Sequence, residues 1–341
     1  MKNIYGITFE ELENYFIEKN DKKFKATQVF DWVYKKRINN FEDMRNVSKE
    51  TIKTMKDDFY FGKLEIIDKK EDVDVAKYLF RLKDNEKVEA VLMYHDYGNS
   101  ICISTQVGCN MGCKFCESGR LKKVRNLEVH EMVSQILMVE EETNKRISHI
   151  VLMGIGEPFD NYDNVIKFID IVNSDKGIAI GSRHITVSTC GIVPKIKEFI
   201  NYDKQVNLAI SLHEPNNEIR NKIMNINKAY PIEEVISVIR DYITKTNRRV
   251  TFEYIMLKGV NDSESCALEL SRLLKGLNCY VNLIPYNETS HIEYKKSNQE
   301  SIMKFYDVLK KNNINVTIRK EFGKGIDAAC GQLRAKEVNK E

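Results

Sequence analysis

The chain has 341 residues, of which 42% are hydrophobic and 30% charged, with 16 Gly and only 5 Pro. At roughly 150 residues per domain, this is a globular protein of about two domains, and the composition excludes disordered, collagen-like and low-complexity classes. Because 53 basic residues face 50 acidic ones, the formal net charge of +3 neither demands nor excludes an anionic partner.

The first residues do not resemble an export signal. Residues 1–16 contain three glutamates where a secretory leader has a basic start and an apolar stretch. No apolar run approaches the roughly 18 residues of a membrane span. Eight cysteines in such a chain argue against a disulfide scaffold. We therefore expect a cytoplasmic protein with no membrane association.

Residues 1–75 are expected to form a small helical accessory domain. Thr8 to Glu11 has the pattern of a helix N-cap followed by an acidic first turn, and a second helix shows one apolar face. That face consists of Val29, Phe30, Val33 and Tyr34. Lysine clusters at 19–25 and 35–37 flank this second helix. Such clusters are usually solvated, but a pair of them could also meet a phosphate backbone.

The texture becomes β-like after residue 75, and residues 76–99 are expected to form a β-hairpin extension with its turn at 84–87. Short apolar strands then alternate with amphipathic helices such as 128–142 and 232–245. The expected strands are 101–105, 150–153, 185–188, 206–212, 250–257 and 280–285. This alternation predicts an α/β fold with a parallel sheet and outer helices.

Six such units fall short of the eight in a closed barrel, so we expect an open, partial barrel. We assign it to residues 100–290, followed by a C-terminal extension over 291–341. In folds of this kind the chemistry lies at the rim formed by the carboxyl ends of the strands.

Three cysteines, Cys109, Cys113 and Cys116, stand within eight residues directly after the first expected strand of the barrel. Three thiolates from one short loop can hold three irons of a cubane and leave the fourth iron open. A zinc site would want a fourth ligand, and the chain has no second Cys-x-x-Cys pair. Zinc binding and chance clustering of core cysteines remain as weaker alternatives.

The Cys-x-x-x-Cys-x-x-Cys spacing resembles that of the radical S-adenosylmethionine (SAM) superfamily. Several further segments resemble the RlmN/Cfr family of RNA adenine methyltransferases within it, over about residues 5–335. These segments are Cys102 to Cys109, Met153 to Pro158, Ser188 to Gly191, Ser211 to His213, Asn282 to Asn287 and Asp327 to Leu333.

The resemblance implies methylation of an adenosine in 23S rRNA, and also in tRNA, at ring carbon 2 in the RlmN branch or carbon 8 in the Cfr branch. Gly156-Glu157-Pro158 resembles the RlmN branch more closely. The target carbon is electron-poor and cannot attack the methyl group of SAM, so a radical route is needed. It would use one [4Fe-4S] cluster, two SAM per turnover, a flavodoxin-like electron donor and a thiol reductant. We expect a monomer.

The resemblance also assigns three catalytic residues. Cys330 matches the cysteine that carries the methyl group, and Cys102 matches the thiol that releases the protein–RNA adduct as a disulfide. Glu89 matches the acceptor of the adenine ring proton. From the hairpin pattern alone, Glu89 would be a surface carboxylate.

The cofactor contacts implied by the resemblance stand at the ends of successive strands. Cys109, Cys113 and Cys116 would bind the cluster. The SAM contacts would be Gly156, Glu157, Ser188, Ser211, Leu212, His213 and Asn287. A histidine such as His213, taken alone, is more typical of a hydrogen-bonded structural residue. Cys190, Cys266 and Cys279 match no role, and we interpret them as structural.

Two positions depart from the family pattern. Glu117 follows the last cluster cysteine where a small residue is usual, and Asn225 stands where proline is usual. Basic residues at 120–125 follow the cluster loop and suit an RNA partner. The alternatives to carbon 2 methylation are carbon 8 methylation, a radical SAM enzyme with a non-RNA substrate, and a non-enzymatic iron–sulfur or zinc module that binds RNA.

Overall fold

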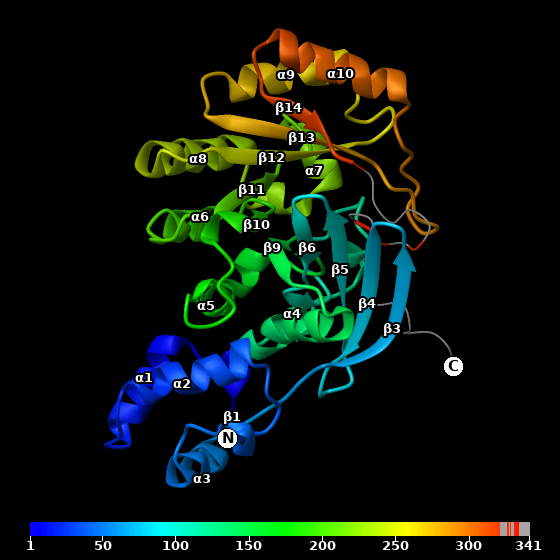
Figure 1. Cartoon of the computed structure of the whole chain (residues 1–341). Coiled ribbons are helices and arrows are strands. Elements are labelled where there is room, and N and C mark those ends of the chain that lie inside the picture. The colour runs from blue at the N-terminus through cyan, green and yellow to red at the C-terminus, as the bar shows by residue number, and fades with distance from the viewer. Residues whose placement is uncertain (321–325, 327, 329–330, 334–341) are drawn as a thin grey trace.

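The computed structural model describes residues 1–320, 326, 328 and 331–333. Its centre is one mixed sheet of ten strands in the order β14-β13-β12-β11-β10-β9-β6-β5-β4-β3. Figure 1 shows this sheet running through the molecule, with the N-terminal helices at one end. Because β14 and β3 stand at opposite ends of the strand order, the described sheet is open, as the six-unit pattern predicted.

The six strands expected from the sequence form the parallel part of the sheet. They are β6 (Gly98–Cys102), β9 (Ile147–Leu152), β10 (Ile185–Thr189), β11 (Asn207–Ser211), β12 (Val250–Met256) and β13 (Cys279–Pro285). β14 (Val316–Ile318) adds a further parallel strand beside β13. The sequence did not predict β14, because three residues are too few to show a period of two.

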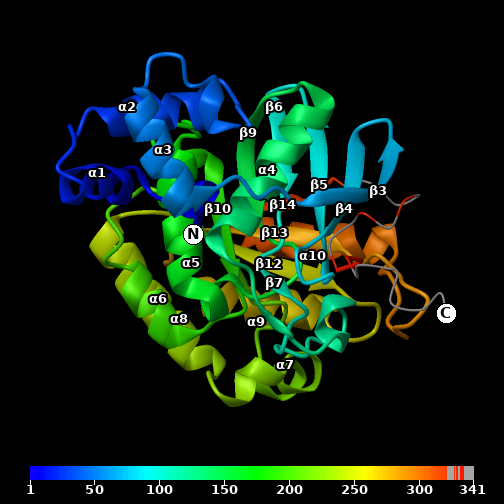
Figure 2. The same ribbon diagram turned by 90° about the horizontal axis from the view of Figure 1, so that it is seen from below.

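Helices cover the outer side of this parallel sheet (Figure 2). They are α4 (Val129–Thr143), α5 (Tyr162–Asn173), α6 (Val193–Phe199), α7 (Asn217–Ile223), α8 (Ile232–Thr246), α9 (Glu264–Leu274) and α10 (Gln299–Lys311). The expected helices at 128–142 and 232–245 are confirmed as α4 and α8. Both end at an asparagine in the left-handed conformation, Asn144 and Asn247, which stops the helix and turns the chain into the next strand.

An antiparallel extension continues the sheet beyond β6. It consists of β3 (Glu65–Asp72), β4 (Val75–Arg81) and β5 (Lys87–His95). The predicted turn is confirmed: Asn85 has φ 67°, which suits the tight connection between β4 and β5. β3 lies within the segment 1–75 that we expected to be helical. That part of the expectation is wrong, because β3 pairs with β4 as the edge of the main sheet.

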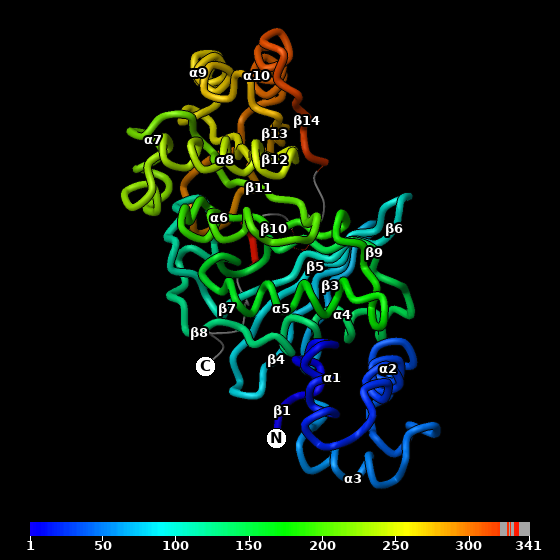
Figure 3. Tube along the Cα trace, turned by 90° about the vertical axis from the view of Figure 1, so that its left-hand side faces the viewer, coloured from blue at the N-terminus to red at the C-terminus, as the bar shows by residue number. Residues whose placement is uncertain are grey.

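The N-terminal residues form α1 (Phe9–Glu18), α2 (Lys25–Phe30), η2 (Asp31–Lys35) and α3 (Lys49–Asp58), with the short pair β1 (Lys2–Asn3) and β2 (Phe59–Tyr60). Thr8 and Glu11 form a capping box at α1, which confirms the predicted helix start. Figure 3 shows these helices gathered below α4 and α5. Their apolar faces join the same core as the sheet. Within the described residues, no helix is long and apolar enough to cross a membrane.

Candidate active site

The loop that carries the three clustered cysteines begins just after β7 (Gln106–Val107). Gly108 has φ +72°, and a Cβ there would come within 2.1 Å of the Lys122 carbonyl oxygen. Gly112 has φ +63°, and a Cβ there would lie 2.7 Å from the Asn225 side chain. Both glycines therefore allow a tight loop that a larger residue would open.

One cavity brings the cysteine loop and the strand ends together. Its lining includes the three clustered cysteines and five of the seven expected SAM contacts, namely Gly156, Glu157, Ser188, Ser211 and His213. Leu212 is buried beside it, with its N–H bonded to the Glu253 carbonyl. Asn287 is also buried, and its Oδ1 has no hydrogen-bond partner in the described part of the chain. An orphaned acceptor of this kind suits a donor group on a bound ligand.

Burial raises the pKa of two of the three clustered thiols, Cys109 and Cys113. Burial raises the pKa of Cys109 to about 12, and the nearby charges of Glu157 and Cys116 add to the rise. Burial and the other two cluster cysteines raise the pKa of Cys113 well above its ordinary value. Three mutually repelling thiolates need cations to exist together, so metal binding here must release protons.

The donor set fits a cluster better than a single ion. Among the described residues, no three His, Cys, Asp or Glu side chains are placed to hold one metal ion. A cubane cluster does not need its three thiolates to converge on one point, since each of them binds a separate iron. The residues that could hold such a cluster are Cys109, Cys113 and Cys116, which line the same cavity.

Glu157 is fixed by the backbone at the end of β9. Its Oε2 accepts the Cys190 N–H at 2.8 Å and its Oε1 accepts the Phe159 N–H at 3.0 Å. Burial raises the pKa of Glu157. Gly156 has φ +110°, and a Cβ there would strike Gln106 at 2.7 Å. The carboxylate retains lone pairs for an ammonium group, while Cys190, which we interpreted as structural, lines the cavity itself.

His213 is a hydrogen-bonded structural residue that also lines the cavity. Its Nδ1 accepts the Ile255 N–H at 3.1 Å, so the neutral ring carries its proton on Nε2. Burial, with the charge of Arg220, lowers the pKa of His213 to about 3, and the ring is neutral at physiological pH. Its φ of 61° is unusual for a residue with a side chain. His213 is therefore a structural histidine that also lines the cavity.

Arg220 was missed by the sequence interpretation. It is fully buried and donates to the carbonyls of Leu212 at 2.9 Å and Cys190 at 2.8 Å, and to Asn227 Oδ1 at 2.7 Å. Thus one guanidinium ties together the ends of β10 and β11. A lone arginine in an exposed-looking helical segment gives no signal of this role.

We expect Arg220→Met to lower the free energy of unfolding by at least ~3 kcal/mol, because it leaves several buried acceptors without donors. Chemical denaturation would measure the change. Arg240→Met, on the exposed side of α8, is the matched control and should stay within ~0.5 kcal/mol of the parent. Equal midpoints for the two variants would contradict this role.

Glu89 and Cys102 share one face of the antiparallel extension. Cys102 is paired across from Val91, and Glu89 is two residues before Val91 on β5, so all three side chains point to the same side. Glu89 is buried and its Oε1 lies 3.2 Å from the ammonium of buried Lys77. The surface-carboxylate interpretation of Glu89 is therefore wrong, because β4 and β6 enclose its strand.

Cys330 lies outside the described residues, but its neighbours in the chain are placed. Ala328 and Leu333 pack in the same apolar cluster as Cys102. The Gly331 carbonyl accepts the Glu117 N–H at 2.8 Å, and the Leu333 carbonyl accepts the Ser118 hydroxyl at 2.8 Å. The described C-terminal residues thus contact both the cysteine loop and the Cys102 cluster.

Both departures from the family pattern lie beside the cysteine loop. Asn225 packs against Gly112, as described above. Glu117 is buried, and neither carboxylate oxygen has a hydrogen-bond partner within the described ranges. Its nearest cations are His291 Nδ1 at 3.4 Å, if that ring is protonated, and Arg120 at 4.0 Å.

Two further charged residues line the cavity, and no sequence pattern indicated either of them. Glu253 on β12 accepts from Asn282 Nδ2 at 2.8 Å, and burial raises its pKa. Arg319, just after β14, also lines the cavity.

Comparison with known proteins first defines the class. Residues 103–268 match the family model of the radical SAM superfamily. The solved structure of a radical SAM methyltransferase from Sphaerobacter thermophilus superposes with a TM-score of 0.92, at 38% sequence identity, over 98% of this chain and 100% of that one. The protein is thus a radical SAM enzyme, and that class implies SAM and a [4Fe-4S] cluster as cofactors.

The particular family follows from closer relatives. Residues 2–60 match the ribosomal RNA large subunit methyltransferase N-terminal domain. The "Probable dual-specificity RNA methyltransferase RlmN" of Enterococcus faecalis is 54% identical over 100% of this chain and 98% of its own length. A protein of the same name from Acholeplasma laidlawii is 53% identical over 98% of this chain. The chain belongs to the RlmN family of radical SAM RNA methyltransferases, which confirms the resemblance seen in the sequence.

Proposed function

We propose that the protein methylates carbon 2 of an adenosine in 23S rRNA, and of an adenosine in tRNA, with two SAM consumed per turnover. One observation carries the proposal. A single cavity is lined by the cysteine loop and the strand-end residues, and the described neighbours of Cys330 contact the loop at its edge. The proposal requires the methyl group carried by Cys330 to meet both the cofactor and a nucleobase.

The proposal assigns the residues of the cavity to cluster binding and SAM binding. Cys109, Cys113 and Cys116 hold the cluster, which when bound supplies the electron that cleaves SAM. Glu157 accepts from the SAM ammonium, and Asn287 Oδ1 accepts a second ligand donor. The remaining contacts, which shape and line the SAM site, are Gly156, Ser188, Ser211, Leu212 and His213.

Three side chains act on the substrate. The Cys330 thiolate takes a methyl group from SAM by displacement. One hydrogen of that methyl group would then pass to the adenosyl group released from a second SAM, and the carbon would bond to the adenine ring. The ring would return one electron to the cluster when it loses its proton. Glu89 removes the ring proton; buried Lys77 lies 3.2 Å from its Oε1 and stabilises the carboxylate until then. Cys102 attacks the sulfur of Cys330, so that a disulfide forms as the carbon–sulfur bond breaks. An external thiol then reduces the disulfide.

The proposal also includes the compartment, the oligomeric state, the electron donor and the domain division of the protein. We infer a cytoplasmic monomer that receives electrons from a flavodoxin-like donor. The accessory domain, which the sequence pattern extended to residue 75, is better ended before β3. We divide the rest into the antiparallel extension, the barrel and a C-terminal segment that carries Cys330.

Mass mapping of modified adenosines in rRNA and tRNA, from cells with and without this protein, tests the proposal. Loss of 2-methyladenosine in the deletion strain is the expected result. Loss of 8-methyladenosine would instead assign carbon 8, and unchanged RNA would point to a substrate other than RNA.

A further inference from the structure

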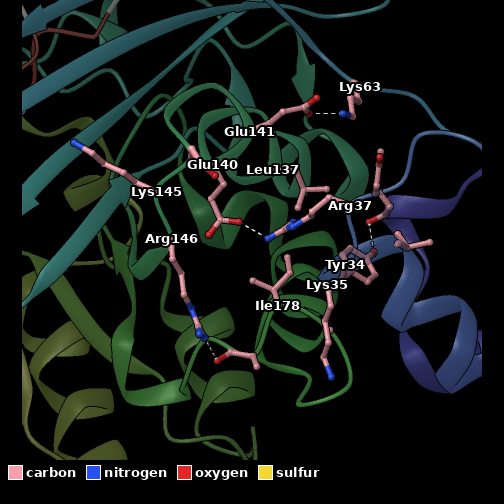
Figure 4. Close-up of a pocket in the computed structure, with 15 residues that line it drawn as sticks. Tyr34, Lys35, Arg37, Lys63, Leu137, Glu140, Glu141, Lys145, Arg146 and Ile178 are labelled. Atoms are coloured by element: carbon pink, nitrogen blue, oxygen red, sulfur yellow. Dashed lines mark hydrogen bonds and ion pairs between the residues drawn. The ribbon is translucent and has the colours of Figure 1, made fainter.

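A second cavity, of about 710 Å³, lies between the N-terminal helices and the C-terminal end of α4 (Figure 4). Its lining residues Asn144 to Arg146 immediately precede β9, whereas the SAM cavity takes residues that end and follow β9. At ~3.3 Å per residue, a six-residue strand separates the two ends by about 20 Å. The cavity is therefore distinct from the catalytic site.

Cations dominate the charge of this cavity. Its lining has two carboxylates, Glu140 and Glu141, which pair with Arg37 and Lys63. It has five basic side chains, Lys35, Arg37, Lys63, Lys145 and Arg146. Three of the five basic side chains therefore have no carboxylate partner within the cavity. This surplus of positive charge favours an anionic ligand.

The three cations that have no carboxylate partner in the cavity differ in what they contact. Lys145 lies 4.1 Å over the ring of Tyr94, while Arg146 donates a long hydrogen bond, of 3.5 Å, to the Ala179 carbonyl. The Lys35 ammonium is 3.9 Å from Asp31, outside the cavity. Figure 4 shows Arg37 and Arg146 entering from opposite sides.

Arg37 gives a second, independent indication of a ligand. Its Nη1 is buried and has no hydrogen-bond partner within the described part of the chain. Leaving such a group unpaired costs about 1–3 kcal/mol. Arg37 and Ala179 both line the cavity with positive φ, of 58° and 59°. Strained residues of this kind cluster at ligand sites.

Aromatic rings next to this cavity in the chain favour a nucleic acid as the ligand. Three residues after Arg146, the ring of His149 stacks on His184 at 4.3 Å and meets Tyr97 edge-on at 5.2 Å. Tyr97 is 68% exposed. The Arg146 carbonyl accepts from Asn99, which ties this loop to the Tyr97 turn. Cations beside exposed π faces are typical of single-stranded nucleic-acid contacts.

We propose that this cavity binds a backbone phosphate of RNA, remote from the nucleotide that is methylated, through Lys35, Arg37 and Arg146. The inference rests on the proposed function, because it takes RNA as the substrate. The inference adds a second contact for a large RNA, at the end of β9 opposite to the SAM cavity.

The double variant Lys35→Gln/Arg146→Gln tests this site while leaving the Arg37–Glu140 and Lys63–Glu141 pairs in place. RNA affinity of the full chain is measured against salt concentration, with a 23S rRNA fragment that extends well beyond the target loop. Each lost phosphate contact removes ~0.7–0.9 from the slope of log affinity against log salt. Because the site holds one phosphate, we expect the slope to fall by about 0.8, so the affinity lost between ~50 mM and ~200 mM salt shrinks by roughly threefold.

The matched control is Arg272→Gln/Lys222→Gln, which removes two exposed cations from α9 and α7 and should leave the slope unchanged. A slope in the test variant equal to the parent's would overturn the proposal. Pyrophosphate and adenosine monophosphate are titrated in parallel. Tight binding of either at this site with an unchanged RNA slope would assign the cavity to a free phosphate compound and overturn the RNA contact.

Failure of this inference is distinguishable from failure of the proposed function. The binding measurement needs neither SAM nor a cluster. A reduced slope supports the phosphate site even if adenosine mapping finds no methyl mark. An unreduced slope rejects the site even if the mark is found.

Discussion

Cys102→Ala is expected to leave the enzyme covalently attached to its RNA, whereas Cys330→Ala is expected to abolish RNA methylation. In the proposed reaction the methylene carbon joins the Cys330 sulfur to the adenine ring, and only attack by a second thiol releases it. Cys102 is buried in the same apolar cluster as Ala328 and Leu333, which flank Cys330 in the chain. Denaturing electrophoresis with labelled RNA should show a shifted band for Cys102→Ala and none for Cys330→Ala.

Cys279→Ala is the control for these two variants. Cys279 is buried at the start of β13, at the opposite end of that strand from the rim, so its loss removes packing without touching the cavity. It should methylate RNA at close to the parental rate and give no shifted band. Unaltered turnover in either test variant would contradict the assigned roles, and so would a shifted band in Cys330→Ala.

Glu89→Gln is expected to slow release of the adduct by roughly 10²–10⁴-fold, the usual contribution of a positioned base. The substitution keeps the shape of the side chain but removes a proton acceptor at a buried position on β5. Earlier steps should survive, so the variant should still cleave SAM and still accumulate the shifted protein–RNA band. Rapid-quench measurement of band formation and decay separates the two phases.

Lys77→Met serves as the comparison for Glu89→Gln. It leaves the Glu89 carboxylate buried without the ammonium that lies 3.2 Å away, which is expected to cost about 3–5 kcal/mol of stability. Glu89→Gln takes the negative charge away from the buried Lys77 ammonium and is also expected to destabilise the fold, although its amide oxygen can still accept a hydrogen bond from Lys77. Normal adduct decay in Glu89→Gln would remove this residue from the catalytic set.

The sequence predicts the parallel part of the fold well because its strands are runs of five to seven residues rich in buried apolar side chains. Start and stop signals mark helix ends, as at Thr8 before α1 and at Asn247 after α8. β14 and β3 lack such signals. β14 is short, and most of the side chains of β3 are at least partly exposed, as expected at a sheet edge.

Some residues of the candidate site could likewise be predicted from the sequence, and others could not. Cys109, Cys113 and Cys116 could be recognised because their spacing alone is typical of a loop that binds an iron–sulfur cluster. Arg220 and Lys77 could not, since each is a common surface residue type that becomes buried only through contacts between distant elements. Glu89 shows the limit most clearly: its local pattern indicates a solvated hairpin, and only the pairing of β5 between β4 and β6 buries it.

The central claim is that a methyl group resides on Cys330 before it reaches RNA. Mass spectrometry of the peptide that contains Cys330, from reconstituted enzyme exposed to SAM without RNA, tests it most directly. The account predicts a peptide heavier by one methyl group in place of one hydrogen, and its absence from Cys113→Ala protein that lacks the cluster. An unmodified Cys330 in fully loaded, SAM-cleaving enzyme would contradict it.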